Sequence, residues 1–366
     1  MTLDRLFNVA RKEFSDHITS RRFIIILALF LVISAISIHE GIEQYNDNLE
    51  SYNEQLQWMN DNDEYEKIGW MPEKPSVMYI FMSMMSYMTG LGGILAIAIG
   101  FDLVSKEKES RSLKTLLSHP IYRDEIINGK VLGGVGALGF AMVLALALSI
   151  AMLLVFSVVP TLDEFAAILI FGVVSLGFLI AYFAVAITMS TVAKESGNAL
   201  IYTLVIFFVV SSLLPVLGTM AADAFAGDPP EPPNVDYSRT FVTGGGSVTA
   251  VRSVAVNDPQ APQEDTDPEW KAYEEELQTY YEKLRLINDV SSILSPQMNY
   301  YRVAMAVTNP SLSTMIYSAY SPEMPEETPG LADALGQVWM NIAALIVFPS
   351  VFFAATYVKF MRMDIR

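Results

Sequence analysis

The stretch FDLVSKEKESRSLKTLLSHPIYRDEIINGK, Phe101–Lys130, lies between two long apolar segments. The first segment ends at Gly100 and the second begins at Val131, and each is long enough to cross a bilayer as a helix. The stretch between them is too short to fold as a domain. Residues 105–118 nevertheless contain strong helix formers and no proline. We therefore expect a short helix that connects two membrane spans.

The predicted helix has a charged side and an apolar side. Glu107 and Arg111 form an i,i+4 pair in the favourable order, and Pro120 ends the helix. An amphipathic helix at the ends of two spans can be a docking element for another chain, or it can be a simple interfacial loop helix. The spacing does not decide between these two interpretations. The apolar side of the helix consists of Leu113, Leu116 and Leu117.

Composition predicts a membrane protein with several spans. Of the 366 residues, 52% are hydrophobic and 17% are charged, a combination that soluble domains rarely have. The chain has no cysteine and only three histidines, which lie far apart, so thiolate chemistry and a histidine metal site are not expected. The predicted fold class is an all-α polytopic membrane protein. Its six transmembrane helices are expected at residues 23–38, 77–101, 131–159, 165–192, 199–220 and 336–357.

Residues 1–22 precede the first span and have apolar residues at helical spacing. Charged residues occupy the other faces, so we expect an amphipathic helix that lies in the membrane interface. The apolar positions are Leu3, Leu6, Phe7, Ala10, Phe14 and Ile18.

The two large polar segments, residues 39–76 and 221–335, each contain apolar residues in alternating steps of three and four. This heptad-like spacing predicts one helix in each segment with a face that needs a partner. We expect the two helices to pack against each other, with Leu49 near Leu277. The first set is Ile42, Tyr45, Leu49, Tyr52, Leu56 and Met59, and the second is Trp270, Tyr273, Leu277, Tyr280, Leu284 and Ile287.

The rest of the second polar segment contains two further predicted features. Residues 239–243 and 247–256 flank the glycine triplet Gly244–Gly246, which indicates a β-hairpin. The apolar residues 303–317 are broken by Asn309 and Pro310, a pattern that suits a re-entrant or interfacial hairpin more than a full span.

Two spans have unusual composition. Gly129 and Gly133 form a GxxxG pair at the start of the third span, followed by Gly136 and Gly139, and small residues at this spacing allow another helix to approach closely. The second span is rich in methionine, which suggests either soft ligands for copper(I) or adaptable packing. Because no cysteine or histidine accompanies these methionines, packing is the favoured interpretation.

The distribution of charge predicts the orientation of the chain. With six spans, both termini lie on one side, and that side holds fifteen of the 23 basic residues and ten of the 40 acidic ones. The other side therefore holds eight basic and thirty acidic residues. Because positive charge accumulates on the cytoplasmic side, both termini are expected in the cytoplasm. The acidic outer side is expected to be mainly a solvated surface.

The chemistry of an enzyme or a self-powered pump is not evident. There is no GxxxxGK[ST] phosphate-binding loop, no HExxH zinc motif and no GxSxG nucleophile elbow. Ionisable residues, which ion-coupled transporters usually carry within their spans, are almost absent from the predicted spans. Any energy would have to come from a partner chain.

Three parts of the chain resemble the ABC-2-type exporter permeases, including the permeases of copper-maturation and sodium-extrusion ABC systems. ARKEFSDHITSRRF (Ala10–Phe23) is similar to the family's amphipathic entry helix, and LSPQMNY (Leu294–Tyr300) to the segment before its last helix. The opening stretch resembles the family's acidic helix followed by "LL-x-x-P", a basic residue and "GK". Ser110 stands where a glycine is frequent. The matching positions are Glu107, Glu109, Leu113, Leu116, Leu117, Pro120, Arg123 and Lys130.

The resemblance implies that two permease copies pair and that each docks one ABC ATPase subunit, which binds ATP and Mg²⁺. Residues 102–130 would form the main coupling helix, and the turn AKESGN at 193–198 would add a second contact through Lys194 and Glu195. The chain itself would hold no cofactor. Its other partner would be membrane lipid, and nucleic acid is not expected.

An alternative is a membrane-anchored receptor or scaffold whose acidic outer region is the working part. Co-purification with an ATPase would separate the two hypotheses. The lack of charge within the spans mildly favours a lipid-like or amphipathic cargo. The acidic exterior and the lack of cysteine suit the plasma membrane of an archaeal or salt-adapted prokaryote.

Overall fold

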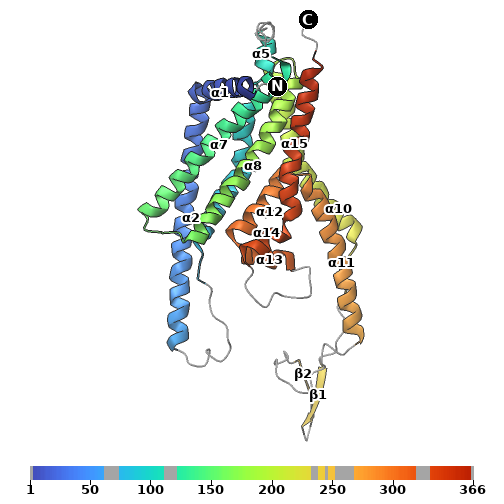
Figure 1. Cartoon of the computed structure of the whole chain (residues 1–366). Helices are drawn as coiled ribbons and strands as arrows, with labels where there is room; N and C mark the ends of the chain where they lie inside the picture. The colour runs from blue at the N-terminus through green and yellow to red at the C-terminus, as the bar shows by residue number, and fades with distance from the viewer. Residues whose placement is uncertain are drawn as a thin grey trace.

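The computed structural model describes residues 3–61, 74–110, 122–231, 238–243, 246–251, 268–318 and 330–363. Nearly all of these residues are helical, and Figure 1 shows long helices gathered into a bundle. The first half of the chain forms α1 (Leu3–Thr19), α2 (Arg21–Asp61), α3 (Ile80–Tyr87), α4 (Gly93–Gly100), α5 (Ser105–Glu109), α7 (Arg123–Val155) and α8 (Leu162–Val192). The second half forms α9 (Ser196–Phe208), α10 (Leu214–Ala226), β1 (Ser238–Thr243), β2 (Gly246–Val251), α11 (Pro268–Ile293), α12 (Pro296–Thr308), α13 (Pro310–Ser318), α14 (Leu331–Gln337) and α15 (Trp339–Met361).

Six helical segments of the described chain are long and apolar enough to cross a membrane, in agreement with the predicted number. The chain is therefore an all-α, multi-pass membrane protein. The segments are Arg21–Met59, Val77–Glu109, Arg123–Val155, Leu162–Val192, Ser196–Ala226 and Trp339–Met361.

The boundaries of these helices differ from the predicted spans. The first span and the helix after it form one continuous helix, α2. The third helix, α7, begins at Arg123 and not at residue 131, because Glu125 accepts a hydrogen bond from the backbone N–H of Tyr122 and caps the helix there. The second and fifth spans each contain a π-helical turn, at Met88–Gly92 and Val209–Leu213.

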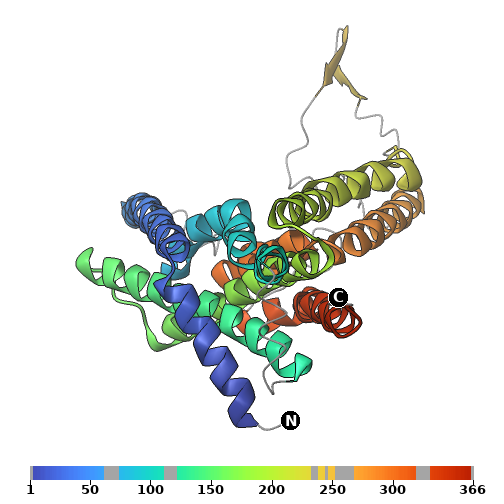
Figure 2. The ribbon, with the colours of Figure 1, turned by 90° about the horizontal axis from the view of Figure 1, so that it is seen from above.

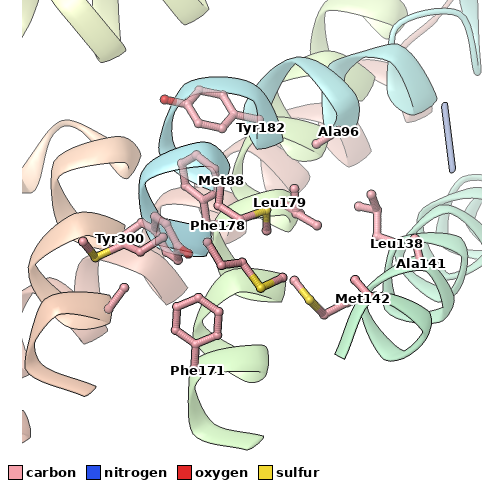
Figure 3. Packing of buried hydrophobic residues seen from close by; sticks show 14 of the residues in the cluster. Met88, Ala96, Leu138, Ala141, Met142, Phe171, Phe178, Leu179, Tyr182 and Tyr300 are labelled. Atoms are coloured by element: carbon pink, nitrogen blue, oxygen red, sulfur yellow. The ribbon is translucent and has the colours of Figure 1, made fainter. Parts of the chain in front are cut away.

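Helix α8 forms the centre of the bundle and contacts α4, α7, α9, α12 and α15. Figure 3 shows its Phe171, Phe178 and Tyr182 within the buried core. The ring of Phe178 stacks on Tyr300 at 4.6 Å, and the Tyr300 hydroxyl is 3.0 Å from Ser175 Oγ. Because lipid tails are as apolar as this core, close packing and such interhelical hydrogen bonds hold the helices together.

The methionine-rich second span contributes to the same core. Its methionines pack among apolar side chains, as the packing interpretation predicts, and Met88 lies beside Phe178 and Leu179 in Figure 3. The buried members are Met78, Met84, Met85 and Met88.

The predicted pairing of the two outer helices is wrong. In Figures 1 and 2, the outer half of α2 and helix α11 lie at opposite sides of the molecule. Helix α11 packs along α10 instead. Heptad spacing identifies the face of α11 that needs a partner, but it does not identify which helix the partner is. Helix α10 can be the partner because it continues to Ala226, beyond the predicted end of the fifth span at residue 220. Helices α10 and α11 can approach each other closely because Gly218 of α10 has no side chain that would collide with Ser291 of α11.

The remaining predictions for the outer region have mixed outcomes. A β-hairpin forms as expected, with β1 antiparallel to β2 and Thr240 opposite Thr249. A helix break occurs at Asn309, between α12 and α13. Helix α12 is buried against α8 and α15, whereas its position relative to a membrane stays a prediction.

Candidate functional site

Helix α5 lies at one end of the bundle, together with α1 and the end of α15 (Figure 1). A turn at Phe101–Val104 separates it from the second span. The hydroxyl of Ser190, near the end of α8, accepts hydrogen bonds from the backbone N–H groups of Val104 at 2.9 Å and Ser105 at 3.0 Å. The first turn of α5 is thereby attached to the central helix of the bundle.

Two charged side chains of α5 contact the connection between α8 and α9. Lys108 Nζ donates to the carbonyl oxygens of Thr191 at 2.5 Å and Ala193 at 2.9 Å, at the negative end of the α8 dipole. Glu109 accepts a hydrogen bond from Ser196 Oγ at 2.9 Å, at the positive start of α9. One short helix therefore joins two successive spans.

A third side chain of α5, Glu107, belongs to a buried ion cluster. Lys130 Nζ is 2.7 Å from Glu107 and 3.0 Å from Glu13 of α1. The side chain of Lys130 is only 2% exposed, and those of Glu13 and Glu107 are 14% and 23% exposed. A lysine buried this deeply requires paired carboxylates, so the cluster ties α1, α5 and α7 together.

Glycines allow this cluster to form. Helix α1 crosses the start of α7 (Figure 2), and the two helices are in contact. A Cβ atom on Gly129 would lie 2.5 Å from Val9, and one on Gly133 would lie 2.6 Å from Glu13 and 3.0 Å from the backbone nitrogen of Phe14. The GxxxG pair thus serves the amphipathic helix, and the close approach that it predicted is confirmed.

Further contacts join this end of the bundle to the other helices. Arg22 at the start of α2 forms an ion pair with Asp102. Arg123 donates from Nη1 to the carbonyl oxygen of Met363 at 2.9 Å, just after α15. Together with the contacts of α5, these contacts connect one end of each of the six spans. We call this set of contacts the terminal network.

A polar cavity of about 310 Å³ lies within the terminal network. Glu13, His17, Asp102, Glu107 and Lys130 line part of it. Burial lowers the pKa of His17 from its ordinary value, and this effect exceeds the opposing attraction of Glu13. Among the described residues, His17 Nε2 and Glu107 Oε2 have no hydrogen-bond partner.

The predicted site residues separate into three groups. Glu109, Lys194 and Glu195 are exposed on the same end of the bundle, where a partner could reach them. Glu107 and Arg123 make contacts within the chain, to Lys130 and to the carbonyl oxygen of Met363, and these contacts hold the ends of helices in position. The others lie outside the described residues, and so does the expected Glu107–Arg111 pair; they are Arg111, Leu113, Leu116, Leu117 and Pro120.

Sequence reasoning did not identify the interior half of the network. The sequence patterns did not single out Lys108 or Glu13, and they identified Lys130 only as a motif position. The signal that could have indicated its burial is a single lysine directly before a long apolar run, within a GxxxG pair.

Comparison with known families gives one match that covers almost the whole chain. A family model described as "ABC-2 family transporter protein" matches residues 7–365. No curated protein matches the chain.

Proposed function

This chain belongs to the ABC-2 transporter family, and from that premise we propose that it is the permease subunit of an ATP-binding-cassette exporter. ATP hydrolysis in a separate ABC ATPase subunit would drive the transport. That subunit would bind the ATP and Mg²⁺, since the sequence of this chain has no phosphate-binding loop of its own.

The observation that carries the proposal is the position of α5. Its backbone bonds to Ser190, Lys108 contacts the end of α8, Glu109 contacts the start of α9, and Glu107 pairs with Lys130 at the start of α7. A force applied to α5 by a docked ATPase would therefore reach several spans at once. Rigid contacts of this kind are what a coupling element needs, because displacement then propagates through packed helices.

The ATPase would contact the exposed surface beside α5, including Glu109, Lys194 and Glu195. We place this surface and both termini in the cytoplasm of a prokaryote, with the chain in the plasma membrane. The excess of basic residues on this side supports the orientation. An archaeal or salt-adapted source is supported by the acidic outer side.

A second permease copy would pair through the fifth span. Few residues of Ser196–Ala226 are buried within one chain, so this span offers an apolar surface to a second copy or to lipid. The exposed apolar side chains on it include Ile201, Val205, Phe208, Val216, Met220 and Phe225.

The test is to solubilise the chain from its native membrane, isolate the ATPase that co-purifies and measure ATP hydrolysis by the complex. Lys194→Glu should weaken the association by about fivefold, the upper range for one exposed ion pair. Lys271→Glu is the matched control, because Lys271 is also exposed but lies on α11 at the opposite end of the molecule. If no ATPase co-purifies, or if both variants behave alike, the proposed docking surface is wrong.

A further inference from the structure

The second and fifth spans both change their packing partner at a π-helical turn. In the second span, α3 packs on α2 and α12 before the turn at Met88–Gly92, and α4 packs on α8 after it. In the fifth span, α9 packs on α8 before the turn at Val209–Leu213, and α10 packs on α11 after it. We call α4 and α9 the inner halves of these spans, and α3 and α10 the outer halves. The inner halves therefore share α8 as a partner, whereas each outer half has a partner of its own.

Each π-turn has a local cause in the sequence. In the fifth span, Pro215 has no backbone N–H, and in a regular α-helix its ring would clash with the carbonyl group of Ser211. The helix is wider there, because the backbone N–H of Leu214 donates to the carbonyl oxygen of Val209, five residues earlier instead of four. In the second span, three glycines within residues 90–93 lower the helix propensity. Helices bend most readily where the regular ladder of hydrogen bonds is interrupted, so both turns are places where a span can bend.

The two π-turns meet at one residue of α8, Tyr182, which is fully buried in the core (Figure 3). A Cβ atom on Gly93, directly after the first π-turn, would lie 2.8 Å from the Phe207 ring and 2.9 Å from the Tyr182 ring. Phe207 lies just before the second π-turn, and its ring centroid is 5.0 Å from that of Tyr182. The Tyr182 hydroxyl forms a hydrogen bond with Ser211 Oγ, inside the second π-turn. One buried side chain therefore connects the two turns.

Both turns lie at a similar depth in the membrane. At about 1.5 Å per residue, Gly90, Tyr182 and Val209 each lie about 15–20 Å from the end of their helix at the terminal network. The hydrocarbon core of a bilayer is about 30 Å thick, so the turns lie near its middle. Water is absent there, and the Tyr182 hydroxyl would be left unpaired without Ser211. The hydrogen bond therefore holds the fifth span against α8 at the point where the span can bend.

We propose that the two π-turns are hinges, and that the hydrogen bond between Tyr182 and Ser211 holds the hinge of the fifth span in its present conformation. Helix α5 follows the inner half of the second span, and residues 193–198 precede the inner half of the fifth. Movement at the terminal network would therefore shift both inner halves together with α8. The outer halves keep their own partners, and the π-turns absorb the change in angle. The hinges depend on this chain alone, whereas their movement by ATP hydrolysis rests on the proposed permease function.

Hydrogen exchange of backbone amides tests the hinges in the chain alone, in nanodiscs. Residues 88–93 and 209–214 should exchange about tenfold faster or more than residues two turns away in the same spans, because their hydrogen bonds open locally. Tyr182→Phe removes only the hydroxyl and should speed exchange at residues 209–214 by about two- to tenfold, the range for one hydrogen bond. Tyr300→Phe is the matched control and should leave this rate unchanged, because the Tyr300 hydroxyl is equally buried but bonds to Ser175 of α8.

A pair of glycine variants tests the contact between the two spans. Gly93→Ala places a methyl group 2.8 Å from Phe207, so it should separate the spans and speed exchange at residues 209–214 by about tenfold or more. Gly90→Ala is the matched control in the same span, because no atom of the described chain lies within 4 Å of its new methyl group. The Tyr182→Phe variant keeps the packed ring, so its result decides even if Gly93→Ala does not fold. Unchanged exchange in Tyr182→Phe, or equal acceleration in Tyr300→Phe, overturns the proposed role of the hydrogen bond.

Distances between spin labels test the movement in the complex with the ATPase. Because the chain has no cysteine, pairs of cysteines can be introduced at exposed positions, and an excess of unlabelled chain keeps each measured distance within one copy. Val173 of α8 and Gln278 of α11 report on the outer half, and Leu132 of α7 and Ile201 of α9 report on the inner half. A bend of about 20° over the roughly 20 Å of α10 would move its far end by about 7 Å.

ATP should therefore change the outer distance by about 7 Å and the inner distance by less than half as much. An intact complex whose outer distance changes no more than its inner distance overturns the hinges and leaves the permease function standing. If no ATPase co-purifies, the permease proposal fails, and the exchange rates of the chain alone still decide whether the π-turns are hinges.

Discussion

The buried cluster of Lys130, Glu13 and Glu107 predicts that Lys130→Met releases α1 and α5 from α7. The substitution keeps a long side chain but leaves two carboxylates without their cation. Removing one partner of a buried ion pair costs about 3–5 kcal/mol. Because the carboxylate side chains retain 14% and 23% exposure, we use the lower end, about 3 kcal/mol. At about 1.4 kcal/mol for each factor of ten, the detached population should rise about a hundredfold.

Detachment of α1 can be measured with a single cysteine. Leu6→Cys places a thiol on the buried side of α1 in a chain that has no other cysteine. When α1 opens and closes faster than a soluble maleimide reacts, the modification rate is proportional to the detached population. The rate should therefore rise about a hundredfold in Lys130→Met. Lys12→Met is the matched control, because Lys12 is exposed on α1, the helix that carries the thiol, and this substitution should leave the modification rate unchanged.

A rescue variant distinguishes loss of the ion pairs from general damage. Adding Glu13→Gln and Glu107→Gln to Lys130→Met removes the unpaired carboxylates, so the modification rate should fall again by about tenfold or more. The reasoning is refuted if Lys130→Met labels no faster than Lys12→Met, or if the triple variant labels as fast as Lys130→Met alone.

Two more predictions concern the same end of the bundle. Gly133→Ala should also speed modification of Leu6→Cys, because the new methyl group would lie 2.6 Å from Glu13. Gly139→Ala would make only an ordinary contact with Leu176 at 3.9 Å, so it should stabilise α7 by up to about 1 kcal/mol and raise the unfolding temperature. Since burial lowers the pKa of His17, detached α1 binds a proton more readily than docked α1, so docking is strongest above about pH 6.5 and weakens as the pH falls below it. The ratio of modification rates between the native sequence and His17→Gln, both carrying Leu6→Cys, should rise from pH 7 to pH 5; a constant ratio would contradict this assignment.

Local sequence patterns predicted much of the fold. Six spans, the amphipathic first helix, the hairpin of β1 and β2 and the helix break at Asn309 all depend on residues close together in the chain. Hydropathy, glycine and proline act over such short distances. The predictions that failed involved contacts between distant segments, above all the pairing of α2 with α11.

The candidate site shows the same division. The charged stretch between two apolar segments identified the region, and Glu109, Lys194 and Glu195 are exposed at the same end of the bundle. Their contact with an ATPase stays a prediction. The sequence did not indicate that Glu107 points inward to Lys130, because an i,i+4 partner was available in the pattern. A side chain selects among all charges that the fold brings near it, and burial strengthens the selection.

The sequence by itself determined where helices form and which of them can cross a membrane, because these properties are set by the apolar content and spacing of contiguous residues. Only the tertiary structure decided which faces meet. The GxxxG pair at Gly129 indicated a close approach, but the fold determined that α1 is the helix that approaches. That choice buries Lys130 between two carboxylates and attaches α5 to the spans. Packing compares all available faces at once, and no local window of the sequence contains that comparison.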